Sequence, residues 1–179
     1  MSRLLDKYRK QVIPSMMAKF GYKNVMAVPK IEKATVNAGA GRISAEPKFK
    51  DRIERDLALI TGQKPSWRLA KKSISGFKVR EGATVGFAST LRGRPMFDFL
   101  DRLISVALPR SRDFRGLDPK SFDEKGSLNI GIKEQIIFPE IAYESSKDIF
   151  SFQVNVTTTA KTKEEGIELL KLIGFPIKN

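Results

Sequence analysis

The chain contains no cysteine and no histidine among its 179 residues. These two absences exclude disulfides, Cys/His zinc sites, thiol nucleophiles, Ser-His-Asp triads and acid-base catalysis by imidazole. The chain also lacks an apolar run of the roughly 18 residues that a membrane-spanning helix needs. Charges between Arg3 and Lys10 are atypical of a signal peptide. We therefore expect a cytoplasmic protein that contacts no membrane and holds no metal or other cofactor.

The length and the apolar content of 41% favour a single globular domain spanning 1–179. The net charge is +13, and it is unevenly distributed. Up to Arg115 there are 25 basic and 10 acidic residues, whereas from Gly116 onward there are 8 basic and 10 acidic residues. All thirteen arginines lie in the first part, and guanidinium groups bind phosphate in a bidentate way. A polyanion is the favoured partner; a solvated basic surface and an anionic membrane are the alternatives.

The spacing of apolar residues predicts a mixture of helices and strands without regular alternation. Helices are expected at 2–21, kinked or split at Pro14, at 47–62, at 96–107, stopped by Pro109, and at 162–174. Strands are expected at 31–37, 66–71, 85–91, 128–133 and 150–157. This order is typical of an α+β fold in which helices cover one face of an antiparallel sheet.

The other face of that sheet is expected to be open and polar. Alternation along the strands places seven polar residues on it, namely Lys33, Thr35, Asn37, Thr90, Arg92, Gln153 and Asn155. A polar sheet face beside basic residues suits RNA, although an ordinary solvated sheet face has the same composition.

Two basic segments lie outside the predicted strands. Residues 72–84 are too long and too polar for a tight hairpin, which predicts a protruding loop. Its candidate RNA-contacting residues are Lys72, Ser73, Ser75, Gly76, Phe77, Lys78 and Arg80, which combine cations, small donors and one exposed ring. Arg110, Arg112 and Arg115 form a second basic turn, which can bind RNA or an acidic protein surface.

Two further patterns have simple structural interpretations. Gly39 and Gly41 follow a strand but lack the third glycine of a dinucleotide-binding fingerprint, because Ser44 stands there. They predict a tight turn with positive φ, or the close approach of another backbone, which can be RNA. Asp98 and Arg102 are four residues apart on a helix and predict a surface ion pair.

Several longer motifs together closely resemble the family of bacterial large-subunit ribosomal protein number five. The motifs are KSISGFKVREG at 72–82, TLRG at 90–93, FLDRLI at 99–104, ALPR at 107–110, RDFRG at 112–116, GIKEQ at 131–135, IFPEI at 137–141 and TTA at 158–160. The resemblance covers nearly the whole chain. It departs at 151–153, where SFQ replaces a Gly-Met-Asp or Gly-Leu-Asp step, and at the end, where IKN replaces an aromatic residue and arginine.

The resemblance implies a structural, non-enzymatic protein of the central protuberance of the large ribosomal subunit. It implies binding of 5S rRNA and large-subunit rRNA, contact with peptidyl-site tRNA through 72–84, and a bridge to a small-subunit protein. The resemblance implies three residues as contacts to 5S rRNA, namely Asn37, Gln63 and Thr90, of which only Gln63 falls outside the predicted polar face. Three more residues of that face, Lys33, Thr35 and Arg92, are added as candidate contacts to 5S rRNA. Arg110, Arg112 and Arg115 are candidates for the bridge or for RNA. The alternatives are an RNA-modifying enzyme, for which no acid-base pair is evident, and an adaptor for an acidic protein.

Overall fold

The computed structural model describes residues 2–40, 47–77, 79–112, 114–141 and 149–178. The α-helices are α1 (Arg3–Lys7), α2 (Ile13–Phe20), α3 (Pro47–Thr61), α4 (Gly93–Arg102), α5 (Leu108–Arg110) and α6 (Lys163–Ile173). The strands are β1 (Ile31–Gly39), β2 (Ser66–Leu69), β3 (Thr84–Leu91), β4 (Leu128–Ile132) and β5 (Phe152–Thr158). None of the helices in these ranges is both long and apolar enough to cross a membrane.

The five strands form one sheet in the order β2-β3-β1-β5-β4, and every neighbouring pair is antiparallel. The register places Thr35 of β1 opposite Thr90 of β3 on one side and opposite Asn155 of β5 on the other. Residues directly opposite each other on antiparallel strands share a face. The predicted α+β class with an antiparallel sheet is therefore confirmed.

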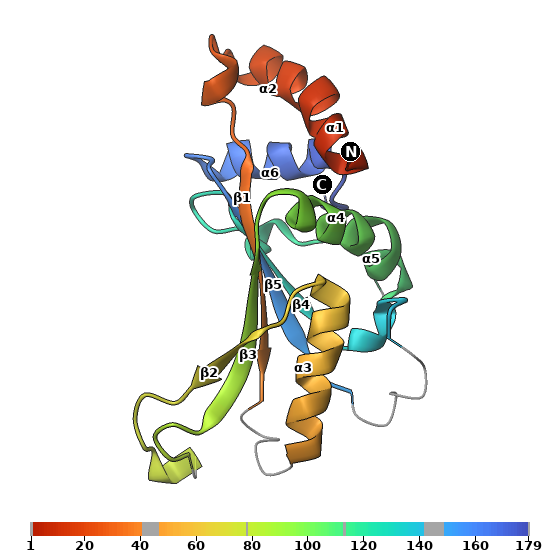
Figure 1. The fold of residues 1–179 in the computed structure, drawn as a ribbon. Coiled ribbons are helices and arrows are strands. Elements are labelled where there is room, and N and C mark those ends of the chain that lie inside the picture. Colours follow the sequence, from red (N-terminus) through yellow and green to blue (C-terminus); the bar gives the residue numbers. More distant parts are fainter. Residues whose placement is uncertain (1, 41–46, 78, 113, 142–148, 179) are drawn as a thin grey trace.

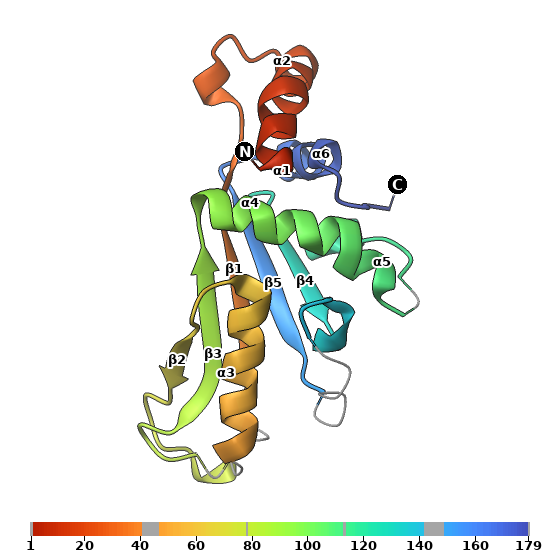
Figure 2. The same cartoon turned by 45° about the vertical axis from the view of Figure 1, so that its right-hand side comes forward.

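The helices divide into two groups. Helices α3 and α4 lie against one face of the sheet, whereas α1, α2 and α6 cluster at one end of the strands (Figures 1 and 2). The core beneath α3 and α4 contains Val36, Phe87, Leu57 and Phe99, which are all inaccessible to solvent. The ends of the chain are joined through Lys7, whose Nζ donates to the carbonyl of Ile173 at 2.7 Å, where the α6 carbonyls lack helical partners.

Two prolines are accommodated inside helices by widened turns. A π-helical turn at Tyr8–Val12 precedes Pro14, and another at Leu103–Ala107 precedes Pro109. Proline lacks an N–H and its ring collides with the carbonyl four residues earlier, and the wider turn accommodates both defects. The helical segment from α1 to α2 therefore continues through Pro14 rather than splitting. The segment from α4 to α5 ends at Arg110, one residue beyond Pro109, where the sequence predicted the stop.

The loop before β4 lies in direct contact with α6 through two glycines. A Cβ added to Gly166 would lie 2.3 Å from both the Cα and the carbonyl oxygen of Gly126. Gly126 itself has φ +73°, and its carbonyl accepts a hydrogen bond from the Thr158 hydroxyl at 3.1 Å. Backbone contact at this point thus connects α6 to the β4–β5 half of the sheet.

The predicted ion pair between Asp98 and Arg102 is wrong. Asp98 pairs with Arg94 at 3.6 Å, whereas Arg102 donates to the carbonyl of Ile60 at 2.7 Å and lies 3.0 Å from Glu140. Arg102 is less exposed than Arg94, so its charge is satisfied by groups from two other parts of the chain. It connects α4 to the end of α3 and to the turn after β4.

Candidate RNA interface

The sheet face opposite α3 and α4 carries a row of hydroxyl and amide side chains. Reading across the sheet, the register aligns Thr90, Thr35, Asn155 and Asn129. All four are half-buried. Asn155 donates to the Asn129 carbonyl oxygen, and the Thr157 hydroxyl donates to Asn155 at 3.1 Å. The two asparagines of this row, on β5 and β4, therefore already have hydrogen-bond partners within the protein.

The adjacent row of side chains makes fewer hydrogen bonds within the protein. It consists of Ser66, Ala88, Asn37, Gln153 and Gly131, from β2 to β4. Asn37 and Gln153 are exposed, and within the described ranges their side-chain amides have no hydrogen-bond partner. Their donors and acceptors are therefore available to an external ligand.

No aromatic side chain occupies this open face along the five strands as described. Phe87 and Phe152 alternate onto the helix-covered side, where Phe87 is fully buried, and Trp67 shares that side because it lies opposite Phe87. Stacking of unpaired bases needs exposed rings, whereas the sugar edge of helical RNA is read by small polar groups. The face is therefore suited to the sugar-phosphate side of structured RNA.

The β1 and β3 residues predicted for RNA contact lie together. Lys33, Thr35 and Asn37 follow one another along the open side of β1, with Thr90 beside Thr35. Arg92 lies just beyond β3, where its guanidinium pairs with Glu32 at 3.3 Å. Both partners of that pair are well exposed, so the pair is weak and its arginine can exchange to a phosphate.

Gln63 lies in the exposed turn between α3 and β2. Because β2 pairs antiparallel with β3 from Ser66 opposite Ala88, the turn lies at the Thr90 end of the sheet. Thr61 shapes this turn: its buried hydroxyl lies 2.7 Å from the Leu57 carbonyl and accepts from the Gln63 N–H at 3.3 Å. No sequence period marks Gln63, because it precedes the strand.

Sequence reasoning missed the β4 contribution to the face. Asn129 and Gly131 alternate with Leu128, Ile130 and Ile132, which are buried. The alternation was visible in the predicted strand 128–133, and it would have placed both residues on the open side.

Segment 72–84 lies at the far end of β2 and β3, away from α1 and α2 (Figure 1). Ile74 and Val79 form an isolated antiparallel bridge around a 3-10 turn at Ser75–Phe77, and the Ser73 hydroxyl accepts from the Glu81 N–H at 2.9 Å. Phe77 is 77% exposed. The other described candidates, Lys72, Ser73, Ser75, Gly76 and Arg80, are exposed too, and Lys78 lies outside the described residues.

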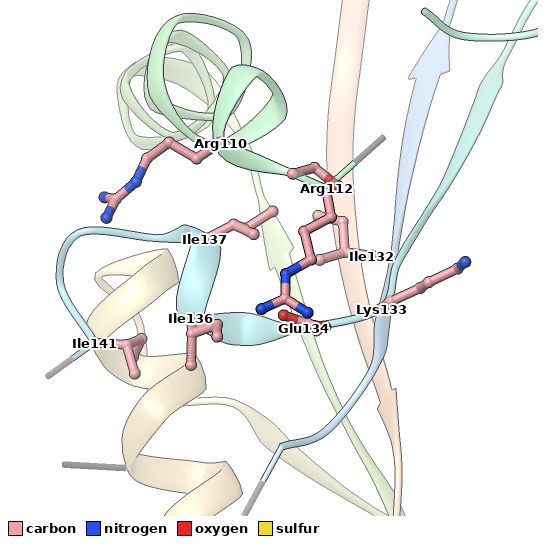
Figure 3. Close-up of a pocket in the computed structure, with 9 residues that line it drawn as sticks. Arg110, Arg112, Ile132, Lys133, Glu134, Ile136, Ile137 and Ile141 are labelled. Atoms are coloured by element: carbon pink, nitrogen blue, oxygen red, sulfur yellow. The ribbon is translucent and has the colours of Figure 1, made fainter. Parts of the chain in front are cut away.

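Two of the three arginines after α4 border a cavity of about 560 Å³. Its apolar lining is Ile132, Ile136, Ile137 and Ile141, and its polar lining includes Arg110, Arg112, Lys133 and Glu134. Figure 3 shows Arg112 pointing toward Glu134 and Arg110 pointing away from it. Arg115 is exposed but does not line the cavity. The cavity combines apolar surface with cations.

Comparison with known proteins gives matches over almost the whole chain. The model described as "Ribosomal protein L5" matches residues 24–80, and that of the "ribosomal L5P family C-terminus" matches residues 84–177. Proteins named "Large ribosomal subunit protein uL5" are similar along their whole length. That of Carboxydothermus hydrogenoformans is 53% identical over 176 residues, covering 98% of each chain. That of Syntrophomonas wolfei is 53% identical over 178 residues, covering 99% of this chain and 100% of the relative.

Proposed function

The chain belongs to the uL5 family of large-subunit ribosomal proteins, and from that premise we propose that it binds 5S rRNA through the open face of its sheet. As a family member it is a structural, non-enzymatic constituent of the large ribosomal subunit, acting in translation in the cytoplasm. The observation that carries the proposal is the polar, aromatic-free face on which Asn37 and Gln153 have no protein partner.

The open face provides two kinds of contact. Lys33 on the face and Arg92 at its edge neutralise phosphates and hold the RNA against the sheet. Asn37, Thr90 and the nearby Gln63 hydrogen-bond 2′-hydroxyls and base edges, which distinguishes RNA from DNA. Cations thus provide affinity, and the short polar groups provide specificity.

Replacing Asn37 or Thr90 by alanine is expected to weaken 5S rRNA binding by about 1 to 3 kcal/mol each, because each loss leaves a desolvated RNA group without its partner. Filter binding of the full chain to 5S rRNA measures this. The salt dependence should stay the same, because neither variant removes a charge. Lys163→Ala, on α6, is the control and should bind as wild type does. Wild-type affinity in both alanine variants would reject the face as the RNA site.

We further propose that segment 72–84 contacts peptidyl-site tRNA. Phe77 offers an exposed ring, and Lys72 and Arg80 offer phosphate contacts beside it. The segment lies at the tip of β2 and β3, beyond the part of the open face that carries Asn37 and Thr90. The two RNAs therefore have separate contact surfaces on the protein.

Deleting 73–81 and joining Lys72 to Gly82 with a two-residue turn should separate the two RNA contacts. The variant retains two backbone hydrogen bonds, from the Ala70 N–H to the Ala83 carbonyl at 2.8 Å and from the Gly82 N–H to the Ala70 carbonyl at 3.0 Å. Strands β2 and β3 should therefore still pair. We expect unchanged thermal stability and 5S rRNA affinity, and weaker peptidyl-site tRNA binding by ribosomes carrying the variant. A folded variant that loses 5S rRNA binding but retains tRNA binding would assign the segment to the 5S site instead.

The cavity beside Arg110 and Arg112 is proposed to bind a small-subunit protein. Its isoleucine lining can bury apolar side chains of a partner, and the two arginines can pair with carboxylates at its border. Arg115 lies outside the cavity and is proposed to contact rRNA.

A further inference from the structure

The open face contains a shallow hollow of about 450 Å³ where β1, β5 and β4 lie side by side. Asn37 and Gly39 line it from β1, and Gly131 lines it from β4. Gln153 lines it from β5, and Ser151 lines it from the residue just before β5. Lys133, the residue just after β4, lines it as well. The β5 and β4 residues of the hollow lie two and three strands away from Thr90 on β3, whereas Asn37 belongs to both the hollow and the Thr90 side of the face.

The fold does not require glycine at the two positions in this hollow. Gly39 and Gly131 both lack positive φ, and a Cβ at either position would meet no atom within 4 Å. Gly86, opposite Gly39, differs, because its Cβ would lie 2.8 Å from the Ala38 carbonyl oxygen. Of the two alternatives predicted for Gly39 and Gly41, positive φ is therefore wrong for Gly39, and Gly41 lies outside the described residues. Glycine weakens a strand, and it often marks a bulge, a bend or a site where a ligand or another backbone comes close.

The groups around the hollow share one chemical preference. The Asn37 and Gln153 amides, the Ser151 hydroxyl and the Lys133 ammonium have no hydrogen-bond or ion-pair partner within the described part of the chain. No carboxylate lines the hollow, and its remaining lining residues, Ile132 and Phe152, are both buried. One cation, two amides and a hydroxyl above bare backbone suit an anion that carries hydroxyl groups, and they offer no ring for a base to stack on.

We propose that this hollow binds one ribose-phosphate unit of 5S rRNA, whose backbone lies directly on Gly39 and Gly131. Lys133 neutralises the phosphate, and Asn37 and Gln153 hydrogen-bond the ribose hydroxyls. This inference rests on the proposed 5S rRNA function and extends the contact surface from β1 and β3 to β5 and β4. The two glycines act by leaving space for the RNA.

The test fills the space without disturbing the fold. Gly131→Val and the milder Gly131→Ala are compared with wild type for 5S rRNA affinity by filter binding and for thermal stability. We expect an unchanged or higher Tm, because a Cβ at this position meets no atom within 4 Å and both substitutions restrict the unfolded chain. For valine we expect an affinity reduced by about tenfold or more, or about 1.4 kcal/mol. Ala18→Val, on the exposed side of α2, adds apolar volume far from the sheet and should bind as wild type does.

Charge provides a second measurement. Lys133→Met should reduce the salt slope of log affinity by about 0.7 to 0.9, which is the value for one phosphate contact. Wild-type affinity in Gly131→Val, together with weakened binding in Thr90→Ala, would reject the hollow as an RNA site and would leave the proposed 5S rRNA binding intact. A lower Tm in both Gly131 variants would overturn it as well, because the glycine would then be structural. Absence of 5S rRNA binding by the wild-type chain would reject the proposed function itself.

Discussion

Replacing Gly166 by alanine is expected to destabilise the protein by about 3 kcal/mol, at the upper end of the range for overpacked sites. The new Cβ would lie 2.3 Å from Gly126 backbone atoms, which cannot rotate away as a side chain would. Alanine is favoured over glycine within a helix by about 1 kcal/mol, so the collision has to exceed this gain. Because whole domains are stable by only about 5 to 15 kcal/mol, the loss is a large fraction of the total.

Thermal unfolding measures the effect of Gly166→Ala, and a Tm lower by about 6 to 12 °C is expected for a chain of this size. Gly131→Ala makes the same change at a strand position where the Cβ has room, and its Tm should not fall. Equal Tm values for the Gly166 variant and wild type would show that α6 can move away from the Gly126 loop without loss of packing.

Raising the salt concentration from about 50 to about 200 mM is expected to weaken 5S rRNA binding about 60-fold. The reason is counterion release: at least about four phosphate contacts give a slope near −3 in log affinity against log salt. Lys33, Arg68 and Lys133 on or beside the open face have no ion-pair partner among the described residues, and Arg92 can leave its exposed pair with Glu32.

A salt series of filter-binding measurements gives this slope. Lys33→Met should make the slope shallower by about 0.7 to 0.9, because it removes a single phosphate contact. Lys171→Met, on α6 in the acidic part of the chain, should leave it unchanged. A slope near zero for the wild-type chain would exclude RNA binding through phosphates.

The sequence by itself determined the class of the fold and most of the binding face. Alternation in 31–37 and 150–157 placed Thr35, Asn37, Gln153 and Asn155 on the open face, because side chains on a strand alternate between its two sides. The N-terminal cap of α6 is also local, because the Thr162 hydroxyl accepts from the Glu165 N–H, three residues along the chain, at 3.3 Å. Such features depend only on residues a few positions apart.

The tertiary structure alone decided the contacts between residues distant in sequence. Arg102 bonds to Ile60 and Glu140 rather than to Asp98, because partly buried charge is satisfied by whichever groups the packing brings close. The role of each glycine also depended on its neighbours. Gly166 touches Gly126, whereas Gly131 faces open space in the hollow that Asn37 and Gln153 also line. Gly131 is two strands away from β1 in the sheet and more than ninety residues away from it in the sequence. Local periodicity carries no information about which strands become neighbours, so the hollow exists only once the sheet has formed.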